Sequence, residues 1–155
     1  MNVRSSLTSY IGVVILLVSS FAFAGVDVET DDNGVILDGY DAVAYFTENS
    51  AVKGSAEYTA VHNDAIYYFS SKKNRELFNK DAAKYAPQYG GFCAYGTTFG
   101  KKLEIDGRAF EVVDGKLYVN KSLNVYETWS EEKAENIQSA NALWPTIKDT
   151  PAADL

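Results

Sequence analysis

The sequence predicts a small single domain of the α+β class, with antiparallel hairpins and several short helices. Two pairs of short strand-like runs, each joined by a two-residue turn sequence, are typical of β-hairpins. Serine-initiated stretches with apolar residues at helical spacing are typical of surface helices. Because the hairpins and helices occur as separate groups, the pattern favours α+β over alternating α/β architecture.

The first hairpin is expected over residues 57–69. Glu57–His62 and Ala65–Phe69 are rich in β-branched and aromatic residues, which fit a pleated, half-buried strand. Asn63-Asp64 lies between them, and both residue types tolerate the left-handed backbone of a two-residue turn. An antiparallel pair is therefore predicted here.

A helix is expected directly after this hairpin. Ser70 and Ser71 carry hydroxyls that can accept hydrogen bonds from the unpaired N–H groups of a first helical turn. A second, shorter helical piece is expected around Asp81–Tyr85, and Pro87 marks its end because proline cannot continue a helix.

The second hairpin has the clearer turn. Phe110–Val113 and Lys116–Val119 are joined by Asp114-Gly115, a sequence strongly associated with two-residue hairpin turns. Glycine takes positive φ at no steric cost, so the turn is favoured whatever packs around it.

Two helices are expected at the C-terminal end of the domain. Ser122 is predicted to cap the first and Ser130 to start the second. Pro145 is predicted to end the second helix. The residues from 148 to 155 are expected to form a loose tail.

Residues 1–24 have the pattern of a secretory signal peptide. Met1–Arg4 is a basic start, Ile11–Phe23 is strongly apolar, and Ala22-Phe23-Ala24 supplies small residues for cleavage before Gly25. A membrane anchor is the alternative, but a spanning helix needs about 20 apolar residues and this run is shorter. We therefore expect a periplasmic or secreted protein with no membrane span after cleavage.

Composition limits the partners of the remaining chain. The formal net charge of −7 argues against nucleic acid, whose phosphates require lysine and arginine. Residues 25–38 form an acidic segment that we expect to be a mobile lead-in, followed by the folded domain at residues 39–147. The acidic residues of this lead-in lack the residue order of a calcium loop, so a solvated segment is expected.

A resemblance to a known family emerges from residues spread along the folded domain. The chain resembles the YHS domain family at matching spacings of Asp41, Val43, His62, Tyr67, Phe69, Ser71, Phe78, Asp81 and Tyr85. The Gly39-Tyr40-Asp41 opening, the Gly90–Cys93 loop and Trp144-Pro145 are similar to the exported branch of that family. The resemblance covers most of the chain from 39 to 144.

The resemblance implies an association with heavy-metal handling, but the matching thiols are absent. Metal-associated members of the family carry cysteines at positions that correspond to Ala44, Ser70 and Asn74 in this chain. Alanine cannot ligate a metal, and serine and asparagine are poor ligands for soft metals.

Cys93 and His62 are the candidate site residues that remain. Cys93 is the only cysteine, so no internal disulfide forms, and it lies in a loop rich in glycine and aromatic residues. His62 is the only histidine. If the two meet in space, the pair could bind copper(I) or zinc, or activate the thiol. Each residue also has an alternative interpretation, Cys93 as a small buried hydrophobe and His62 as a strand-end residue bonded to backbone.

A ligand pocket near Cys93 is a further expectation from the aromatic content. Its candidate lining residues are Tyr67, Tyr89, Phe92 and Tyr95.

Three hypotheses about function follow. The leading one is a non-catalytic exported binding protein that takes a soft metal ion such as copper, or a small molecule, with Cys93 and His62 as metal ligands. The second is a thiol redox enzyme that uses Cys93 and depends on an external thiol, because the chain has no resolving cysteine. The third is a structural or partner-binding module in which Cys93 only packs.

Overall fold

The computed structural model describes residues 26–155, so the expected signal peptide and Gly25 lie outside the described residues. This part of the chain forms a small α+β domain, which confirms the predicted class. The helices are α1 (Ala44–Thr47), α2 (Lys72–Lys80), α3 (Ala82–Tyr85), α4 (Ala94–Thr97), α5 (Leu123–Glu131) and α6 (Lys133–Ile147). The strands are β1 (Ser55–His62), β2 (Ala65–Phe69), β3 (Asp106–Val113) and β4 (Lys116–Asn120).

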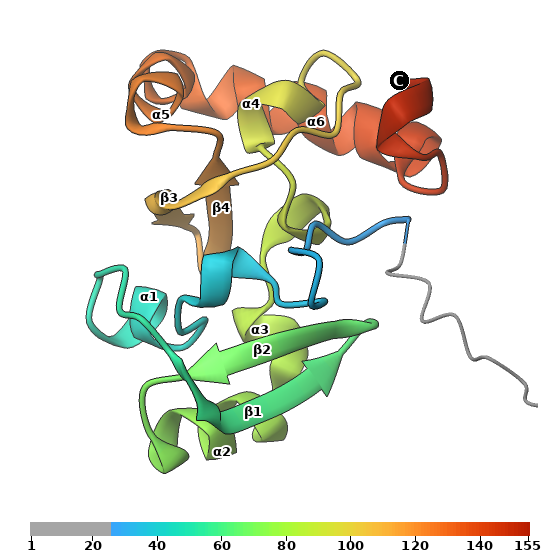
Figure 1. Cartoon of the computed structure of the whole chain (residues 1–155). Coiled ribbons are helices and arrows are strands. Elements are labelled where there is room, and N and C mark those ends of the chain that lie inside the picture. The colour runs from blue at the N-terminus through green and yellow to red at the C-terminus, as the bar shows by residue number, and fades with distance from the viewer. Residues whose placement is uncertain (1–25) are drawn as a thin grey trace, which may run out of the picture.

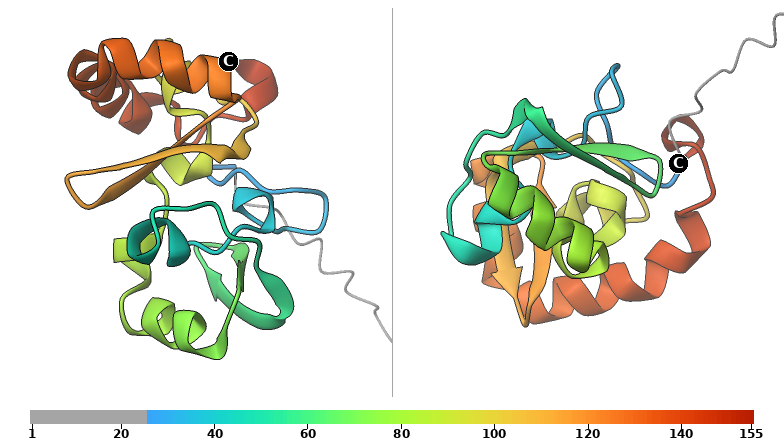
Figure 2. Two further views of the ribbon diagram at one scale, coloured as in Figure 1. Left: turned by 90° about the vertical axis from the view of Figure 1, so that its left-hand side faces the viewer. Right: turned by 90° about the horizontal axis from the view of Figure 1, so that it is seen from below.

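The two hairpins lie in opposite halves of the molecule. The β1–β2 hairpin is covered by α2 and α3 at one end, and the β3–β4 hairpin lies with α4, α5 and α6 at the other (Figures 1 and 2). The N-terminal segment runs between the halves. One apolar core joins them, with Leu37, Phe69 and Leu117 completely buried.

The first hairpin forms as the sequence predicts. His62 pairs with Ala65, and the turn residues Asn63 and Asp64 have φ values of 48° and 60°. Alternate residues of β2 are buried, as the two-residue period of a strand requires. The free edge of β2 is partly covered, since Val35 forms a parallel bridge with Ile66.

The second hairpin divides the interior into two apolar clusters. Its turn is the predicted Asp114-Gly115 pair, and all residues of β4 after Lys116 are buried. Leu117 belongs to the main core, while Tyr118 points to the opposite face and stacks on Trp129 at a centroid distance of 5.6 Å. Burial on both faces explains the unbroken apolar run Leu117–Val119 in the middle of β4.

Two helix caps are confirmed. The hydroxyl oxygen of Ser71 accepts a hydrogen bond from the Asn74 amide at 3.1 Å, and that of Ser122 accepts one from the Val125 amide at 3.2 Å. Each cap satisfies a backbone donor that the first helical turn leaves unpaired.

Two expectations for the last helices are wrong. Ser130 lies in the final turn of α5, and α6 begins at Lys133 instead. Pro145 does not end α6, which continues to Ile147. A proline this close to the helix end costs a single backbone hydrogen bond, so the last turn can form around it.

The segment expected as a mobile lead-in lies against the folded core. Its buried side chains are Val28, Val35, Ile36 and Leu37. The amide of Glu29 also donates a hydrogen bond of 2.9 Å to the carbonyl of Gly90. How this segment moves in solution, and the domain boundaries drawn from it, stay predictions.

Lys102 holds the two ends of the described chain together. Its side chain is buried, and its ammonium group donates hydrogen bonds to the carbonyl oxygens of Val26, Lys148 and Thr150 at 2.8, 2.6 and 2.6 Å. These carbonyls come from the N-terminal segment and from the predicted loose tail. One lysine therefore connects both segments to the domain.

Candidate functional site

Cys93 is sealed in the interior. Its side chain has no exposed surface, and its sulfur accepts hydrogen bonds from the amides of Gly96 and Lys121 at 3.4 and 3.3 Å. The thiol lies 3.7 Å from the Asn120 Oδ1 atom, to which it donates. Burial raises the pKa of the Cys93 thiol, although these backbone hydrogen bonds act to lower it. The sulfur caps α4 and is held as a neutral thiol.

His62 is not brought to Cys93. The imidazole lies at the end of β1, edge-on to Phe78 with a centroid distance of 6.0 Å and 6.4 Å from Tyr67. The β1–β2 hairpin and α4 are in opposite halves of the molecule in Figure 1 and in the left view of Figure 2. Within residues 26–155, no group of three or more His, Cys, Asp or Glu side chains is arranged to hold a metal ion.

The four aromatic residues that were expected to line one pocket do not line a common cavity. Tyr67 lines a hollow of about 150 Å³ whose wall includes Trp144. Tyr89 and Phe92 are not among the lining residues of that hollow, and their rings lie 6.0 and 6.3 Å from the Trp144 ring. Tyr95 belongs to α4 instead.

The glycine-rich loop that precedes Cys93 serves a packing role. A Cβ atom at Gly90 would lie 1.8 Å from the carbonyl oxygen of Asp27, and the φ of Gly90 is +60°. Only glycine permits so close an approach of two backbones in this conformation. The loop therefore receives the N-terminal segment and does not present the thiol to solvent.

The three positions that the resemblance aligns with family cysteines lie around one buried carboxylate. Asp41 Oδ1 accepts hydrogen bonds from the amides of Val43 and Ala44 at 2.9 and 3.2 Å. Asp41 Oδ2 accepts from the amide and hydroxyl of Ser70 and from Asn74 Nδ2, at 2.8, 2.7 and 2.8 Å. Five donors satisfy this carboxylate, so it acts as a structural connection between α1, β2 and α2.

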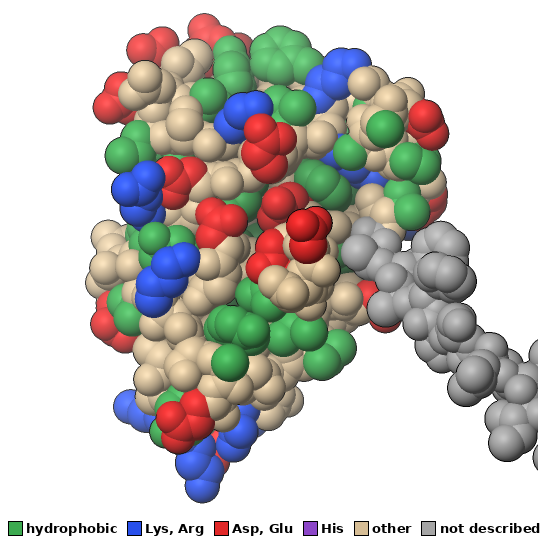
Figure 3. All heavy atoms as spheres, viewed as in Figure 1, with side chains coloured by type: hydrophobic (Ala, Val, Ile, Leu, Met, Phe, Trp, Pro, Cys, Tyr) green, Lys and Arg blue, Asp and Glu red, His purple; other side chains and the backbone are tan. Residues whose placement is uncertain are grey.

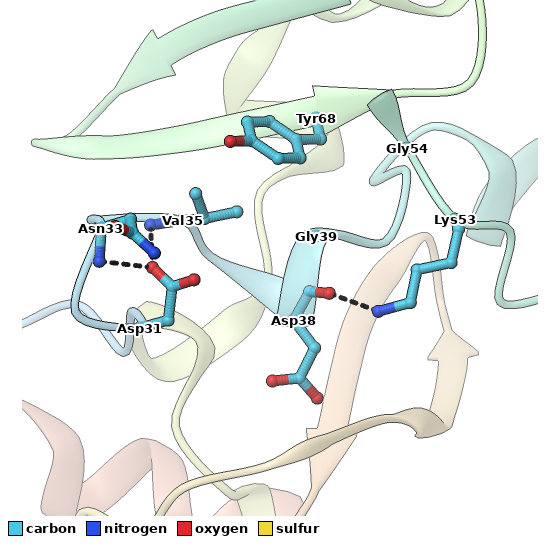
Figure 4. Close-up of a pocket in the computed structure, with 8 residues that line it drawn as sticks. All are labelled: Asp31, Asn33, Val35, Asp38, Gly39, Lys53, Gly54 and Tyr68. Carbon is cyan, nitrogen blue, oxygen red and sulfur yellow. Dashed lines mark hydrogen bonds between the residues drawn. The ribbon is translucent and has the colours of Figure 1, made fainter. Parts of the chain in front are cut away.

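A larger cavity opens on the face where the N-terminal segment crosses the β1–β2 hairpin. It has a volume of about 350 Å³, and we call it the acidic pocket (Figure 4). Its lining residues are Asp31, Asn33, Val35, Asp38, Gly39, Lys53, Gly54 and Tyr68. The Tyr68 ring lies on one side and the Asp31 carboxylate on another, whereas the Asp38 carboxylate points away from Tyr68, toward Gly107 of β3.

Local hydrogen bonds position the two carboxylates. Asp31 Oδ1 accepts from the amides of Asn33 and Val35 at 2.8 and 2.9 Å, and the bond from Val35 is the main reason that the pKa of Asp31 is lowered. Asp38 Oδ2 accepts from the Gly107 amide at 2.9 Å. In each case the hydrogen bonds use one carboxylate oxygen, while the other has no partner among residues 26–155.

Lys53 lies at the edge of the acidic pocket and is already held in place. Its ammonium group donates a hydrogen bond of 2.6 Å to the carbonyl oxygen of Asp38. The same group lies 3.9 Å from the centroid of the Tyr40 ring, a cation–π contact.

Acidic side chains concentrate around this pocket. The space-filling view shows carboxylates grouped across the middle of the face (Figure 3). Burial raises the pKa of Glu29 to about 7, with further contributions from the negative charges of Asp38, Glu104 and Asp31. Desolvation is the main cause of the shift, and the three negative charges add to it.

Sequence reasoning missed this cavity. The acidic lead-in supplies Asp31 and Asp38, and both side chains are exposed, as expected for a solvated segment. No sequence pattern linked Lys53 or Tyr68 to this pocket, because neither residue is close in sequence to Asp31 or Asp38. The pocket exists only where the N-terminal segment folds back over β2.

No family model matches this chain, and neither a curated protein nor a solved structure shows significant similarity to it. The resemblance to the YHS domain therefore stays a prediction. Within the described residues, none of the helices combines the length and the apolar character needed to cross a membrane.

Proposed function

We propose that this protein is a non-catalytic exported binding protein with a YHS-like domain, and that it holds a small ligand in the acidic pocket. One observation carries the proposal: this cavity combines an aromatic wall, Tyr68, with polar groups of Asp31, Asn33 and Lys53. Ligand pockets have volumes from about 300 Å³ upward and contain a few convergent polar groups beside apolar surface. The acidic pocket has both properties.

The convergence of Ala44, Ser70 and Asn74 on Asp41 supports the YHS-like assignment. Only the resemblance links these three positions, which lie in separate segments of the chain. In the structure each of them donates a hydrogen bond to the Asp41 carboxylate. Hydrogen bonding replaces thiol ligation at that point, which favours a member of the family that does not bind metal there.

The surroundings of Cys93 favour a structural role over metal binding or redox chemistry. A thiol needs a thiolate form and an access route to react or to ligate, and Cys93 has a raised pKa and no exposed surface. Copper or zinc binding through Cys93 and His62 stays a prediction without support from their positions.

Fragment screening by NMR on the ¹⁵N-labelled mature protein tests the proposed site. We expect bound fragments to shift the backbone resonances of Gly39, Gly54 and Tyr68 while leaving Gly96 beside the thiol unchanged. The variant Tyr68→Leu should weaken these effects, whereas Tyr58→Leu, on the neighbouring strand, should not. If no fragment perturbs the pocket resonances, the proposed function is wrong.

A copper titration separates this proposal from the thiol hypotheses. Under anaerobic conditions, wild type and Cys93→Ser should bind copper(I) equally weakly, because the sulfur is inaccessible. Distinctly tighter binding by the wild type would favour the soft-metal function.

A further inference from the structure

We infer that the outer edge of β1 is a docking site for an extended acidic segment of a partner protein, which adds to the β1–β2 hairpin as a further strand. This surface is separate from the acidic pocket, so the inference goes beyond the proposed function. It follows from unpaired backbone groups along β1, from the lack of residues that normally protect such an edge, and from a basic helix beside it.

The backbone of β1 has unpaired hydrogen-bonding groups on the side away from β2. His62 and Ala65 flank the two-residue turn and therefore form a hydrogen-bonded pair. Because this pattern alternates along the strand, the backbone groups of Ala60 and His62 point toward β2, while those of Thr59 and Val61 point outward. No strand or bridge among residues 26–155 pairs with that outer side. Thr59 and Val61 therefore each offer an N–H and a C=O to an added strand.

The opposite edge of the hairpin is already in use. The amide of Ile66 donates a hydrogen bond of 2.8 Å to the Gly34 carbonyl, and its carbonyl accepts one of 3.1 Å from the Ile36 amide. Ile66 is the cross-strand partner of Val61, so these bonds agree with a Val61 backbone that is not bonded to β2. The N-terminal segment thus covers one edge of the hairpin, and the described chain leaves the other edge open.

The open edge lacks the usual protection. Sheet edges are commonly shielded by proline, by lysine or inward-pointing charges, or by a bulge. Residues 59–62 contain no proline, lysine, arginine or carboxylate, and the irregularity in β1 lies between Ser55 and Thr59. Val61 is 73% exposed, the highest value among the large apolar side chains exposed on the described chain. An added strand would cover this side chain as well as pair the backbone.

A basic helix lies beside this edge in a chain whose formal net charge is −7. In Figure 1 α2 lies below β1, and Figure 3 shows basic side chains gathered at this end of the molecule. The basic residues of α2 and α3 are Lys72, Lys73, Arg75, Lys80 and Lys84, and the acidic residues from 72 to 85 are Glu76 and Asp81. Only Lys72 of the basic group forms an ion pair within the described chain, with Glu76 at 3.8 Å. The local charge is therefore positive and largely unpaired.

Arg75 connects this charge to the strand. A hydrogen bond with Glu57 and the charge of Glu57 raise the pKa of Tyr58, while the positive charge of Arg75 acts to lower it. The Arg75 guanidinium therefore lies close enough to β1 to act on a side chain of that strand. A negative group on an added strand would meet the same positive charge.

The alternation of side chains defines the chemistry of the partner. Along β1 the side chains of residues 58, 60 and 62 are half-buried, and those of residues 57, 59 and 61 are exposed. An added strand likewise places every second side chain on the α2 side, where Arg75 favours carboxylates, and the others beside Val61, where apolar β-branched residues fit. The expected partner segment alternates acidic and apolar residues.

A second copy of this chain fits the edge less well. Antiparallel pairing of two β1 strands around a two-fold axis would place both α2 helices on the same face of the joined sheet. The unpaired charges of Lys73 and Arg75 would then oppose those of the other copy, because like charges repel. An acidic segment is attracted by the same charges.

Three capped peptides test the inference on the ¹⁵N-labelled mature protein at low salt. The first alternates valine and glutamate, the second has lysine in place of each glutamate, and the third is the glutamate peptide with two adjacent amides N-methylated, which prevents strand addition on either edge. The glutamate peptide should slow amide exchange at Thr59 and Val61 about tenfold at saturation, whereas Ala60 and His62 are already protected by β2. It should bind about tenfold more tightly than the lysine peptide, and the N-methylated peptide should not protect these amides.

Variants assign the effect to the edge and to the helix. Val61→Pro removes an outward N–H without removing a bond to β2, so it should abolish binding while the turn resonances of Asn63 and Asp64 stay in place. Val61→Thr keeps the N–H and the β-branched shape and is its control. Arg75→Gln leaves the strand unchanged and should weaken the glutamate peptide several-fold. Lys116→Gln, an exposed lysine on the other hairpin, removes the same charge and should have little effect.

Contrary results would overturn separate parts of the inference. Equal affinity for the lysine and glutamate peptides would rule out the acidic partner, and protection by the N-methylated peptide would rule out strand addition. Slower exchange at Thr59 and Val61 with rising protein concentration, in the absence of peptide, would assign the edge to a second copy. If millimolar glutamate peptide leaves exchange at both amides unchanged, the edge is not a docking site.

Discussion

The buried charged residues and the pocket carboxylates differ in how completely their hydrogen bonds are satisfied. Asp41 accepts five hydrogen bonds in the interior, and the buried ammonium of Lys102 donates three. Asp31 and Asp38, in contrast, each leave one oxygen without a partner among residues 26–155. The difference separates charges that stabilise the fold from charges that remain available to a ligand.

Burial explains this difference. An ionised group removed from water must recover its hydration from protein donors or acceptors, so a buried carboxylate is retained only with a full set of partners. A carboxylate at the edge of a cavity keeps contact with water and can remain partly unpaired. Variants at the two kinds of position should therefore have opposite consequences for stability and binding.

The largest effect is expected at Asp41. Asp41→Ala leaves the Ser70 and Asn74 donors unpaired in the interior, so it should lower the free energy of unfolding by about 3–5 kcal/mol. Urea denaturation followed by tryptophan fluorescence measures the change. Asp32→Ala, at an exposed position, is the control, and a loss at Asp41 no larger than that of the control would remove the contrast.

A smaller loss is expected at Lys102. Lys102→Met keeps most of the packing but leaves the carbonyls of Val26, Lys148 and Thr150 without their donor, at a cost of about 2 kcal/mol. Amide hydrogen exchange should show faster opening of both terminal segments. Lys101→Met, which changes the adjacent lysine, should leave exchange at the termini as in wild type. Unchanged protection in Lys102→Met would mean that the lysine does not hold the ends.

Glu29 should give the protein a specific dependence on pH. Its folded pKa of about 7 lies above the ordinary value of 4.5, so the folded state binds the proton more tightly than the unfolded state. The stabilisation is therefore complete below pH 4.5 and is lost as the pH rises through 7. The side chain is partly exposed, and after allowance for solvent screening we expect about 1 kcal/mol.

Comparison of wild type with Glu29→Gln isolates this contribution. Urea unfolding at intervals from pH 5 to pH 8 should show that the wild type loses more stability than the variant across that range. Parallel curves for the two proteins would contradict a raised pKa at Glu29.

The smallest stability effect is expected within the acidic pocket. Asp38→Asn should change the free energy of unfolding by less than about 0.5 kcal/mol, because the amide oxygen can still accept from Gly107 and the unpaired oxygen contributes little to the fold. The same chemical denaturation assay is used. A loss comparable to that of Asp41→Ala would place Asp38 among the structural charges and weaken the case for a ligand.

Much of the local structure could be predicted from the sequence. Both hairpin turns formed where Asn63-Asp64 and Asp114-Gly115 indicated, and Ser71 and Ser122 cap their helices as expected. These features depend on backbone preferences within a few residues. The errors at Ser130 and Pro145 arose at helix ends, where tertiary packing decides between closely balanced alternatives.

The candidate sites could not be predicted in the same way. Cys93 was a candidate metal ligand or nucleophile, with a small buried hydrophobe as the alternative, and only the fold shows that α4 and the end of β4 enclose its sulfur. The partners of Asp41 lie 29 and 33 residues along the chain, and the Asp31–Tyr68 pocket needs the N-terminal segment to cross β2. Neither arrangement leaves a local pattern in the sequence.

The sequence by itself determined the α+β class, the two hairpin turns and the helix starts at Ser71 and Ser122, because these depend on contacts between near neighbours in the chain. Only the tertiary structure decided which charges are buried and satisfied and which line a cavity. That distinction depends on solvent exposure and on hydrogen-bond partners from distant segments, and both are defined only once the chain has folded.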